Sequence, residues 1–217
     1  SQNQIPPCSG MGSSAAALVA GIFGANELLG RPLNQADMLK LATELEGHPD
    51  NVAPALLGGL VVSVMNEGEI LSRRYETPSL AAVIVKPDVD WPTRVARAVL
   101  PPSVPRADAI FNIGRTALVV DALRSGDLDL LRKVMDDRLH QPYRLERIPG
   151  GKAAFEAARR FGAAALSGAG PSILCFVESG QERQALTAIQ TAFEAAGVLA
   201  RGLVTRPSTQ GCAVCAD

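Results

Sequence analysis

The stretch that most constrains the fold is residues 5–17, which read Ile-Pro-Pro-Cys-Ser-Gly-Met-Gly-Ser-Ser-Ala-Ala-Ala. Pro6 and Pro7 have a fixed φ and no N–H group, so they favour an extended approach to the glycines after them. Gly10 and Gly12 let the backbone turn sharply and approach a ligand with no Cβ in the way. The pattern predicts an extended segment, a tight loop and then a helix.

The helix after these glycines is predicted over residues 13–29, and Gly30 with Pro32 ends it. Ser13 and Ser14 occupy the positions where N-cap residues belong. The first N–H groups of a helix lack intrahelical partners and lie at the positive end of its dipole, so such a helix start binds phosphate. The alternative is a glycine-rich turn that only precedes a helix.

The type of phosphate loop is narrowed by the residues around it. It is not a Walker A loop, because the first lysine in the chain is Lys40. Gly10, Gly12 and Ala15 fit the loose form of the dinucleotide fingerprint, which leaves an oxidoreductase with a nicotinamide or flavin cofactor as an alternative. That fingerprint requires an acidic residue after a second strand, and the nearest acid, Glu27, lies inside the predicted helix.

Three blocks of the sequence resemble one family. The run Pro-Pro-x-x-Gly-x-Gly-Ser-Ser-Ala-Ala closely resembles the phosphate loop of the GHMP small-molecule kinases. Residues 46–59, Glu-Gly-His-Pro-Asp-Asn-Val-Ala-Pro-Ala-Leu-Leu-Gly-Gly, resemble that family's second block in the form found in homoserine kinases. Residues 167–172, Ser-Gly-Ala-Gly-Pro-Ser, resemble its third block, which we expect to close over phosphates or to pack against the first loop.

The resemblance implies a two-domain α+β fold, and the mixed order of predicted helices and strands favours the same class. Residues 1–78 are expected to form the remainder of an N-terminal GHMP kinase domain of the ribosomal S5 domain 2 type. Residues 79–217 are expected to form a ferredoxin-like α/β C-terminal domain. Since the chain begins with Ser1, almost on the phosphate loop, it is expected to lack the family's N-terminal segment.

Periodicity and turn residues predict the remaining elements. A short helix ending at Leu57 is expected to be capped by Asp50 or Asn51, and residues 140–144 are expected to form a loop. The other predicted helices cover residues 34–46 (capped by Asn34), 93–100, 108–124, 127–139, 152–161 and 181–196. The predicted strands are 60–65 with 70–75 as a hairpin, 80–85, 163–166 with 172–177 around the third block, 200–205 and 211–214.

The resemblance implies ATP as the phosphate donor and Mg²⁺ as its counterion. Magnesium in such sites takes a hydroxyl or a carboxylate together with waters. Ser14 is expected to supply the hydroxyl, and Glu44 or Glu46 the carboxylate; the family's motif order favours Glu44, although either acid is equally compatible with a solvated helix face. The residues expected to bind ATP are Pro6, Pro7, Cys8, Ser9, Gly10, Met11, Gly12, Ser13, Ser14, Ala15 and Ala16.

The acceptor alcohol is expected beside His48, Asp50 and Asn51, three polar residues within four positions. A capping turn is the alternative for this cluster. In several GHMP kinases an aspartate of this block is the general base, but Asn51 holds that place here, as in homoserine kinases. An amide takes up no proton at neutral pH. The expected mechanism is therefore direct in-line attack by the hydroxyl, with Asp50 as the alternative base.

The resemblance also implies homoserine as substrate, whose carboxylate suits arginine. Arg97 follows Thr93 by one helical turn, so both are expected to face one ligand. Arg144 lies in residues 140–144, which resemble the family's basic loop. Each arginine alone would be read as a surface residue, and His140 as a packed loop histidine.

The expected function is ATP-dependent phosphorylation of the homoserine hydroxyl to O-phosphohomoserine, in threonine synthesis. Another GHMP-type small-alcohol kinase and a non-catalytic truncated kinase fragment are the alternatives. A metal-dependent hydrolase built on Glu46, His48 and Asp50 is disfavoured, because the chain has only two histidines.

Composition excludes some partners. The net charge is −1, from 21 basic and 22 acidic residues, so no global field attracts nucleic acid or an anionic membrane. The longest apolar run, residues 15–25, is about half the length of a membrane-spanning helix. The four cysteines form no dense framework and indicate a reduced, cytoplasmic protein, with a homodimer as a possible assembly.

Overall fold

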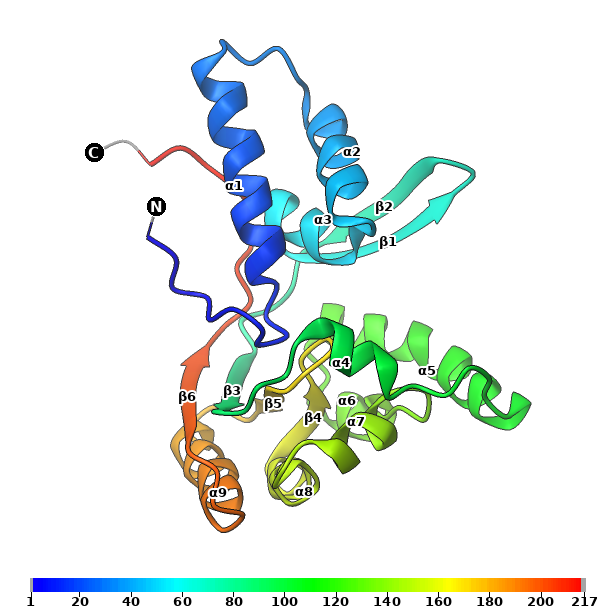
Figure 1. The fold of residues 1–217 in the computed structure, drawn as a ribbon, viewed down its shortest axis with the longest axis vertical. Helices are drawn as coiled ribbons and strands as arrows, with labels where there is room; N and C mark the ends of the chain where they lie inside the picture. Colours follow the sequence, from blue (N-terminus) through cyan, green and yellow to red (C-terminus); the bar gives the residue numbers. More distant parts are fainter. Residues whose placement is uncertain (1, 216–217) are drawn as a thin grey trace. The chain divides into compact units, whose positions relative to one another are not determined.

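The computed structural model describes residues 2–215, and the chain divides into two compact units. Among the described residues, 2–7, 12–77 and 207–215 form the first unit, and 8–11 with 78–206 form the second unit. Both units combine helices with antiparallel strands (Figure 1). The predicted α+β class is therefore confirmed. The predicted domains, 1–78 and 79–217, stay a prediction.

The first unit packs its helices against a two-stranded antiparallel hairpin. Its core joins Ala15 and Val19, from the first helix, to Val52, Ala53 and Leu56 from the third. The predicted hairpin is confirmed, with Val64 paired to Leu71. The elements are α1 (Ser13–Leu28), α2 (Gln35–Glu46), α3 (Pro49–Leu57), β1 (Leu60–Asn66) and β2 (Glu69–Tyr75).

The ends of α2 follow local rules that the sequence displays. The Asn34 side chain accepts a hydrogen bond from the Asp37 N–H at 3.0 Å, which caps the helix as predicted. Gly47 ends the helix in the left-handed region, with φ at 91°.

The start of α1 corrects the predicted cap. The N-cap is Gly12, with φ at 72°, and no side chain caps the helix. Ser13 and Ser14 instead begin the helix itself. The Ser13 hydroxyl donates to the Ile5 carbonyl at 2.9 Å and accepts from the Asn3 amide at 2.9 Å, so it anchors the extended lead-in rather than the helix end.

The start of α3 also differs from the prediction. His48 is the N-cap, Pro49 opens the helix, and Asp50 lies in the first turn. Proline is favoured at this position because its missing N–H would have no helical partner and its φ already suits a helix. Neither Asp50 nor Asn51 is therefore the cap, and both side chains project from the first turn.

The predicted strand at 211–214 is wrong, because these residues form no strand. The Cys212 N–H donates to the Leu56 carbonyl at 3.2 Å, and the Gly59 N–H donates to the Ser208 carbonyl at 2.8 Å. The segment therefore pairs with the C-terminal end of α3 instead of joining a sheet.

The second unit is built on a four-stranded antiparallel sheet in the order β4-β5-β3-β6. The predicted pairing of the strands around the third glycine block is confirmed, with Leu166 opposite Ile173. Its elements are β3 (Ala81–Pro87), α4 (Thr93–Ala98), α5 (Arg106–Ser125), α6 (Leu128–Val134), α7 (Gln141–Arg147), α8 (Gly151–Arg159), β4 (Gly162–Leu166), β5 (Ile173–Val177), α9 (Glu182–Glu194) and β6 (Ala200–Thr205).

Helices cover both faces of this sheet, as the alternation along β3 shows. Val83 and Val85 are fully buried in a core shared with Phe155 of α8 and Phe193 of α9. Ala82, on the opposite face, belongs to a separate core that includes residues of α5 and α6. Because successive residues of a strand point to opposite faces, a strand buried on both sides reads as an unbroken apolar run.

Two predictions in the second unit are wrong. The helix predicted over 127–139 ends at Val134, and the loop predicted over 140–144 is the first part of α7, whose N-cap is His140. The Asp137 carboxylate accepts hydrogen bonds from the backbone N–H groups of His140 and Gln141 at 2.7 and 2.6 Å. It thereby starts a new helix where a loop was predicted.

Candidate active site

The predicted ATP-binding residues Pro6–Ala16 are divided between the two units. Pro6, Pro7 and residues 12–16 belong to the first unit, and residues 8–11 belong to the second. In the first unit, α1 has no acidic residue in its first turn. Its first N–H groups, at residues 13–15, precede the first helical hydrogen bond, from Ala16 to Gly12. This helix start therefore offers donors and positive potential to an anion.

Residues 8–11 are held by the third glycine block within the second unit. The Ser167 hydroxyl donates to the Gly10 carbonyl at 2.9 Å. Gly10 has φ at 76°, and a Cβ placed on it would lie 1.9 Å from the Ser167 carbonyl oxygen. Ser9 is buried and its hydroxyl accepts from the Met11 N–H at 3.2 Å. The expectation that the third block packs against the first loop is confirmed, and only glycine fits at position 10.

Ser14 contacts Glu46, the alternative to the predicted metal ligand Glu44. The Ser14 hydroxyl donates to the Glu46 carboxylate at 3.1 Å, whereas Glu44 is exposed. Among the described residues no three histidine, cysteine, aspartate or glutamate side chains cluster as a complete metal cage. One hydroxyl beside one carboxylate suits a magnesium ion that also keeps waters and substrate phosphates. The contact therefore favours Glu46 over Glu44.

The predicted acceptor cluster lies beside the start of α1, within the first unit. The His48 Nδ1 atom is 2.5 Å from an Asp50 carboxylate oxygen, and the Asn51 amide is 3.5 Å from that same oxygen. A Cβ placed on Gly12 would lie 3.6 Å from the Asn51 Oδ1 atom. The Asn51 amide and the helix start are therefore close neighbours, although 39 positions in the sequence separate Gly12 from Asn51.

The predicted substrate arginines, Arg97 and Arg144, both lie in the second unit. The Arg144 Nε atom donates to the Ala96 carbonyl, at 3.1 Å, so this guanidinium lies against α4. Arg144 is buried and Arg97 is exposed. Burial lowers the pKa of Arg144, Asp137 raises it and the charge of Arg97 lowers it further. Guanidinium groups suit the recognition of carboxylates and phosphates. Thr93 is exposed at the first residue of α4.

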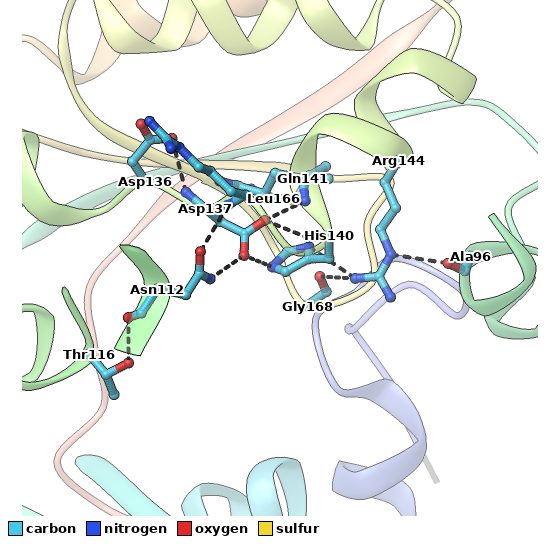
Figure 2. A network of polar contacts seen from close by, with 11 residues as sticks. Ala96, Asn112, Thr116, Asp136, Asp137, His140, Gln141, Arg144, Leu166 and Gly168 are labelled. Carbon is cyan, nitrogen blue, oxygen red and sulfur yellow. Dashed lines mark hydrogen bonds and ion pairs between the residues drawn. The ribbon is translucent and has the colours of Figure 1, made fainter. Parts of the chain in front are cut away.

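A hydrogen-bonded network behind Arg144 was not predicted (Figure 2). The Arg144 Nη1 atom is 3.1 Å from His140 Nδ1 and donates to the Gly168 carbonyl at 3.4 Å. Asp137 receives the Asn112 amide at 2.6 Å, in addition to the two backbone N–H groups at the start of α7. The Leu166 N–H donates to the Gln141 side chain at 2.6 Å, which ties α7 to the sheet. We call Asn112, Asp137, His140, Gln141 and Arg144 the α7 network.

Burial and hydrogen bonding oppose one another at Asp137. Burial raises the pKa of Asp137. The hydrogen bonds from Gln141, His140 and Asn112 and the charge of His140 lower this pKa by more, so its net shift is downward. Burial lowers the pKa of His140; Asp137 raises it and Arg144 lowers it, again with a net decrease. At neutral pH the network therefore contains a carboxylate, a neutral imidazole and a guanidinium.

The sequence held one signal for this network. An aspartate close before a helix start can accept from that helix's first N–H groups, and Asp137 precedes Gln141, the first residue of α7, by four positions. Asn112 carried no comparable signal, because it reaches Asp137 from the middle of α5.

No helix among residues 2–215 combines the length and apolar character that crossing a bilayer requires.

Comparison with known proteins agrees with this arrangement. The family model for the GHMP kinases N terminal domain matches residues 1–59, and that for GHMP kinases C terminal matches residues 119–195. The chain is 47% identical to a homoserine kinase of Moorella thermoacetica over 215 residues, which cover 98% of this chain and 72% of the relative. It is 42% identical to a homoserine kinase of Desulfitobacterium hafniense, over 98% of this chain and 73% of that one.

A solved structure gives the same result. The crystal structure of homoserine kinase from Cytophaga hutchinsonii superposes with a TM-score of 0.88 at 32% identity, covering 96% of this chain and 69% of that one. The fold is thus the GHMP kinase fold. The chain belongs to the homoserine kinase family of the GHMP kinases.

Proposed function

We propose that this protein transfers the γ-phosphoryl group of ATP to the hydroxyl of homoserine, yielding O-phosphohomoserine for threonine synthesis. The observation that carries the proposal is the position of the Asn51 amide beside Gly12, at the phosphate-binding start of α1. An alcohol acceptor and a polyphosphate donor both need groups at this place, since phosphoryl transfer depends mainly on positioning and charge stabilisation.

The donor site uses backbone groups more than side chains. The N–H groups at the start of α1 bind the phosphates of ATP, and Gly10 and Gly12 allow the backbone to approach them. Ser14 and Glu46 would hold Mg²⁺, which supplies neutralisation of the developing phosphate charge when bound. Glu44 remains the alternative ligand.

The acceptor is held without a dedicated base. The Asn51 amide orients the homoserine hydroxyl and accepts no proton itself, so the proton passes to phosphate or solvent. Asp50 is 2.5 Å from His48, and this contact makes it a holder of the imidazole rather than the first choice as base. His48 and Asp50 then contribute to substrate binding at the same helix start.

The amino-acid part of the substrate carries a carboxylate, and the side chains proposed to bind it are Arg144 and Arg97. A guanidinium donates strong, charge-assisted hydrogen bonds to a carboxylate. Thr93 stands one helical turn before Arg97 on α4 and supplies a hydroxyl on the same face.

The test is coupled ADP release with homoserine, mevalonate, shikimate and galactose as acceptors. We expect homoserine to give the highest kcat/KM, by at least tenfold. An equal or higher value for another alcohol would contradict the substrate and leave a GHMP small-alcohol kinase. No ADP release above the rate without acceptor would favour a non-catalytic member of the fold. Cytoplasmic localisation and a homodimer stay predictions, which fractionation and light scattering would test.

A further inference from the structure

The Arg144 guanidinium is held by three polar contacts within the second unit. Its Nε atom donates to the Ala96 carbonyl at 3.1 Å, and its Nη1 atom reaches both His140 Nδ1, at 3.1 Å, and the Gly168 carbonyl, at 3.4 Å. A guanidinium has five N–H donors, and these three contacts leave those of Nη2 for a ligand. The three contacts therefore fix the plane of the guanidinium group and leave its Nη2 end to bind a ligand.

One of these contacts requires a particular state of His140. A guanidinium only donates hydrogen bonds, so His140 Nδ1 must accept, and the imidazole proton must reside on Nε2. The Asp137 carboxylate lies 3.8 Å from Nε2. At that distance it acts on the imidazole as a charge rather than through a short hydrogen bond, and its negative charge favours the proton on the facing nitrogen.

Three hydrogen bonds hold the Asp137 carboxylate in its orientation. One carboxylate oxygen receives the backbone N–H groups of His140 and Gln141, and the other receives the Asn112 amide (Figure 2). Its side chain is 11% exposed. The carboxylate therefore cannot rotate towards Arg144 to form a direct ion pair without losing three hydrogen bonds.

We propose that Asp137 and His140 are positioning residues that hold the Arg144 guanidinium in the orientation that binds the substrate carboxylate. Asp137 sets the tautomer and ring orientation of His140, and His140 Nδ1 holds Arg144 Nη1. This inference rests on the proposed function, because it assigns the substrate carboxylate to Arg144. Neither residue touches substrate or the transferred phosphoryl group.

The arrangement makes substrate binding dependent on pH. A protonated His140 carries N–H groups on both nitrogens, so it cannot accept from Arg144 and adds a second positive charge beside it. The charged groups that act on this pair are Asp137, which precedes α7, Arg144 on α7 and Arg97 on α4. As the pH falls through the pKa of His140, which burial holds below its usual value, the KM for homoserine rises.

Kinetics of two His140 variants test the proposal. In His140→Phe the acceptor is lost, and we expect the KM for homoserine to rise roughly tenfold, as loss of a charge-assisted hydrogen bond implies, while the KM for ATP stays within twofold. In His140→Asn an amide oxygen replaces Nδ1 without titrating. We expect a KM within about threefold of the original and loss of the rise at low pH.

A double-mutant cycle separates positioning from a general structural role. If His140 acts through Arg144, His140→Phe has no further effect on the KM for homoserine once Arg144 is replaced by alanine. Multiplicative effects of the two substitutions would overturn the proposal, as would an unchanged KM in His140→Phe alone. Either result would leave the homoserine kinase function standing.

Imidazole nitrogen NMR supplies a readout that needs no activity. The chain has two histidines, so His140→Asn assigns the signals. We expect His140 to be the Nε2–H tautomer at pH 7 and Asp137→Asn to shift it towards a mixture. A His140 that is protonated on Nδ1 at pH 7 would contradict the inference. If the unaltered protein did not phosphorylate homoserine, that result would contradict the proposed function and not the positioning role of His140.

Discussion

The acceptor cluster of the first unit and the α7 network of the second unit hold their polar side chains by different kinds of contact. His48 and Asp50 have side chains that are 35% and 70% exposed, and short-range contacts at the start of α3 hold them. Arg144 is buried and the Asp137 side chain is only 11% exposed, and groups from α5, α4 and the third glycine block help to hold them. Exposed groups follow local sequence, whereas buried groups depend on distant partners, because each buried polar atom needs one.

The largest expected effect tests the loop that the third glycine block holds. Gly10→Ala places a Cβ 1.9 Å from the Ser167 carbonyl oxygen, at a residue with φ of 76°. We expect kcat/KM for ATP to fall by on the order of 100-fold, since displacing a positioning group by about 1 Å costs that much. Gly21→Ala is the matched control, because nothing lies within 4 Å of its Cβ position. Equal activities of the two variants would contradict the close packing at Gly10.

The second effect compares a buried arginine with an exposed one. Arg144→Lys removes the fork that the network orients, so we expect kcat/KM for homoserine to fall by about 100-fold. Arg97→Lys keeps a charge on an exposed stem, and we expect a loss of about fivefold. Steady-state kinetics at fixed, saturating ATP measure both. A larger loss in Arg97→Lys would reverse the ranking of the two side chains.

The third effect concerns the acceptor cluster. Asn51→Asp places a carboxylate beside the helix start proposed to bind the ATP phosphates, where like charge would oppose them, so we expect kcat to fall by about tenfold. Asn66→Asp, on the exposed β1–β2 hairpin, makes the same chemical change away from the site and should leave kcat unaltered. Unimpaired turnover in Asn51→Asp would argue against a positioning role for the amide.

The smallest effect is on stability and its dependence on pH. The pKa of Asp137 is lowered by its hydrogen bonds, against the opposing effect of burial, so its stabilising contribution is present above 3.8 and is lost as pH falls through the lower folded-state value. The lowered pKa of His140 likewise costs stability as pH falls below 6.5. Urea unfolding should show Asp137→Asn about 1 kcal/mol less stable at pH 7.

The same titration checks the histidine separately. His140→Asn removes the group that must be neutral in the fold, so its free energy of unfolding should fall less between pH 7 and pH 5 than that of the original chain. A steeper fall in His140→Asn would mean that the imidazole is stabilised in its charged form, contrary to the assigned tautomer.

Local patterns explain why much of the fold and part of the site were predictable. The cap at Asn34, the end of that helix at Glu46 and the hairpin between β1 and β2 depend on residues close in sequence, and each prediction was confirmed. The contact between Ser167 and Gly10 was expected only because both belong to recognisable glycine blocks. Two of the wrong predictions, a loop at 140–144 and a strand at 211–214, lie where a distant or upstream partner outweighs local preference.

The α7 network shows why the remaining parts of the site could not be predicted from the sequence. Asn112 reads as an ordinary polar residue of α5, and nothing in its neighbours indicates that its amide meets Asp137, 25 positions later. Arg144 was identified by resemblance, yet its burial and its contact with Ala96 of α4 follow only from the packed structure. Side chains can be nominated from sequence, but the groups that orient them cannot.

The most direct test of the central claim is ³¹P NMR of ATP and homoserine incubated with the full protein and Mg²⁺. We expect a new phosphomonoester resonance, coupled to the methylene protons next to the former hydroxyl, that grows in step with ADP. Formation of ADP with inorganic phosphate alone, or no homoserine-dependent signal, would contradict homoserine phosphorylation by this protein.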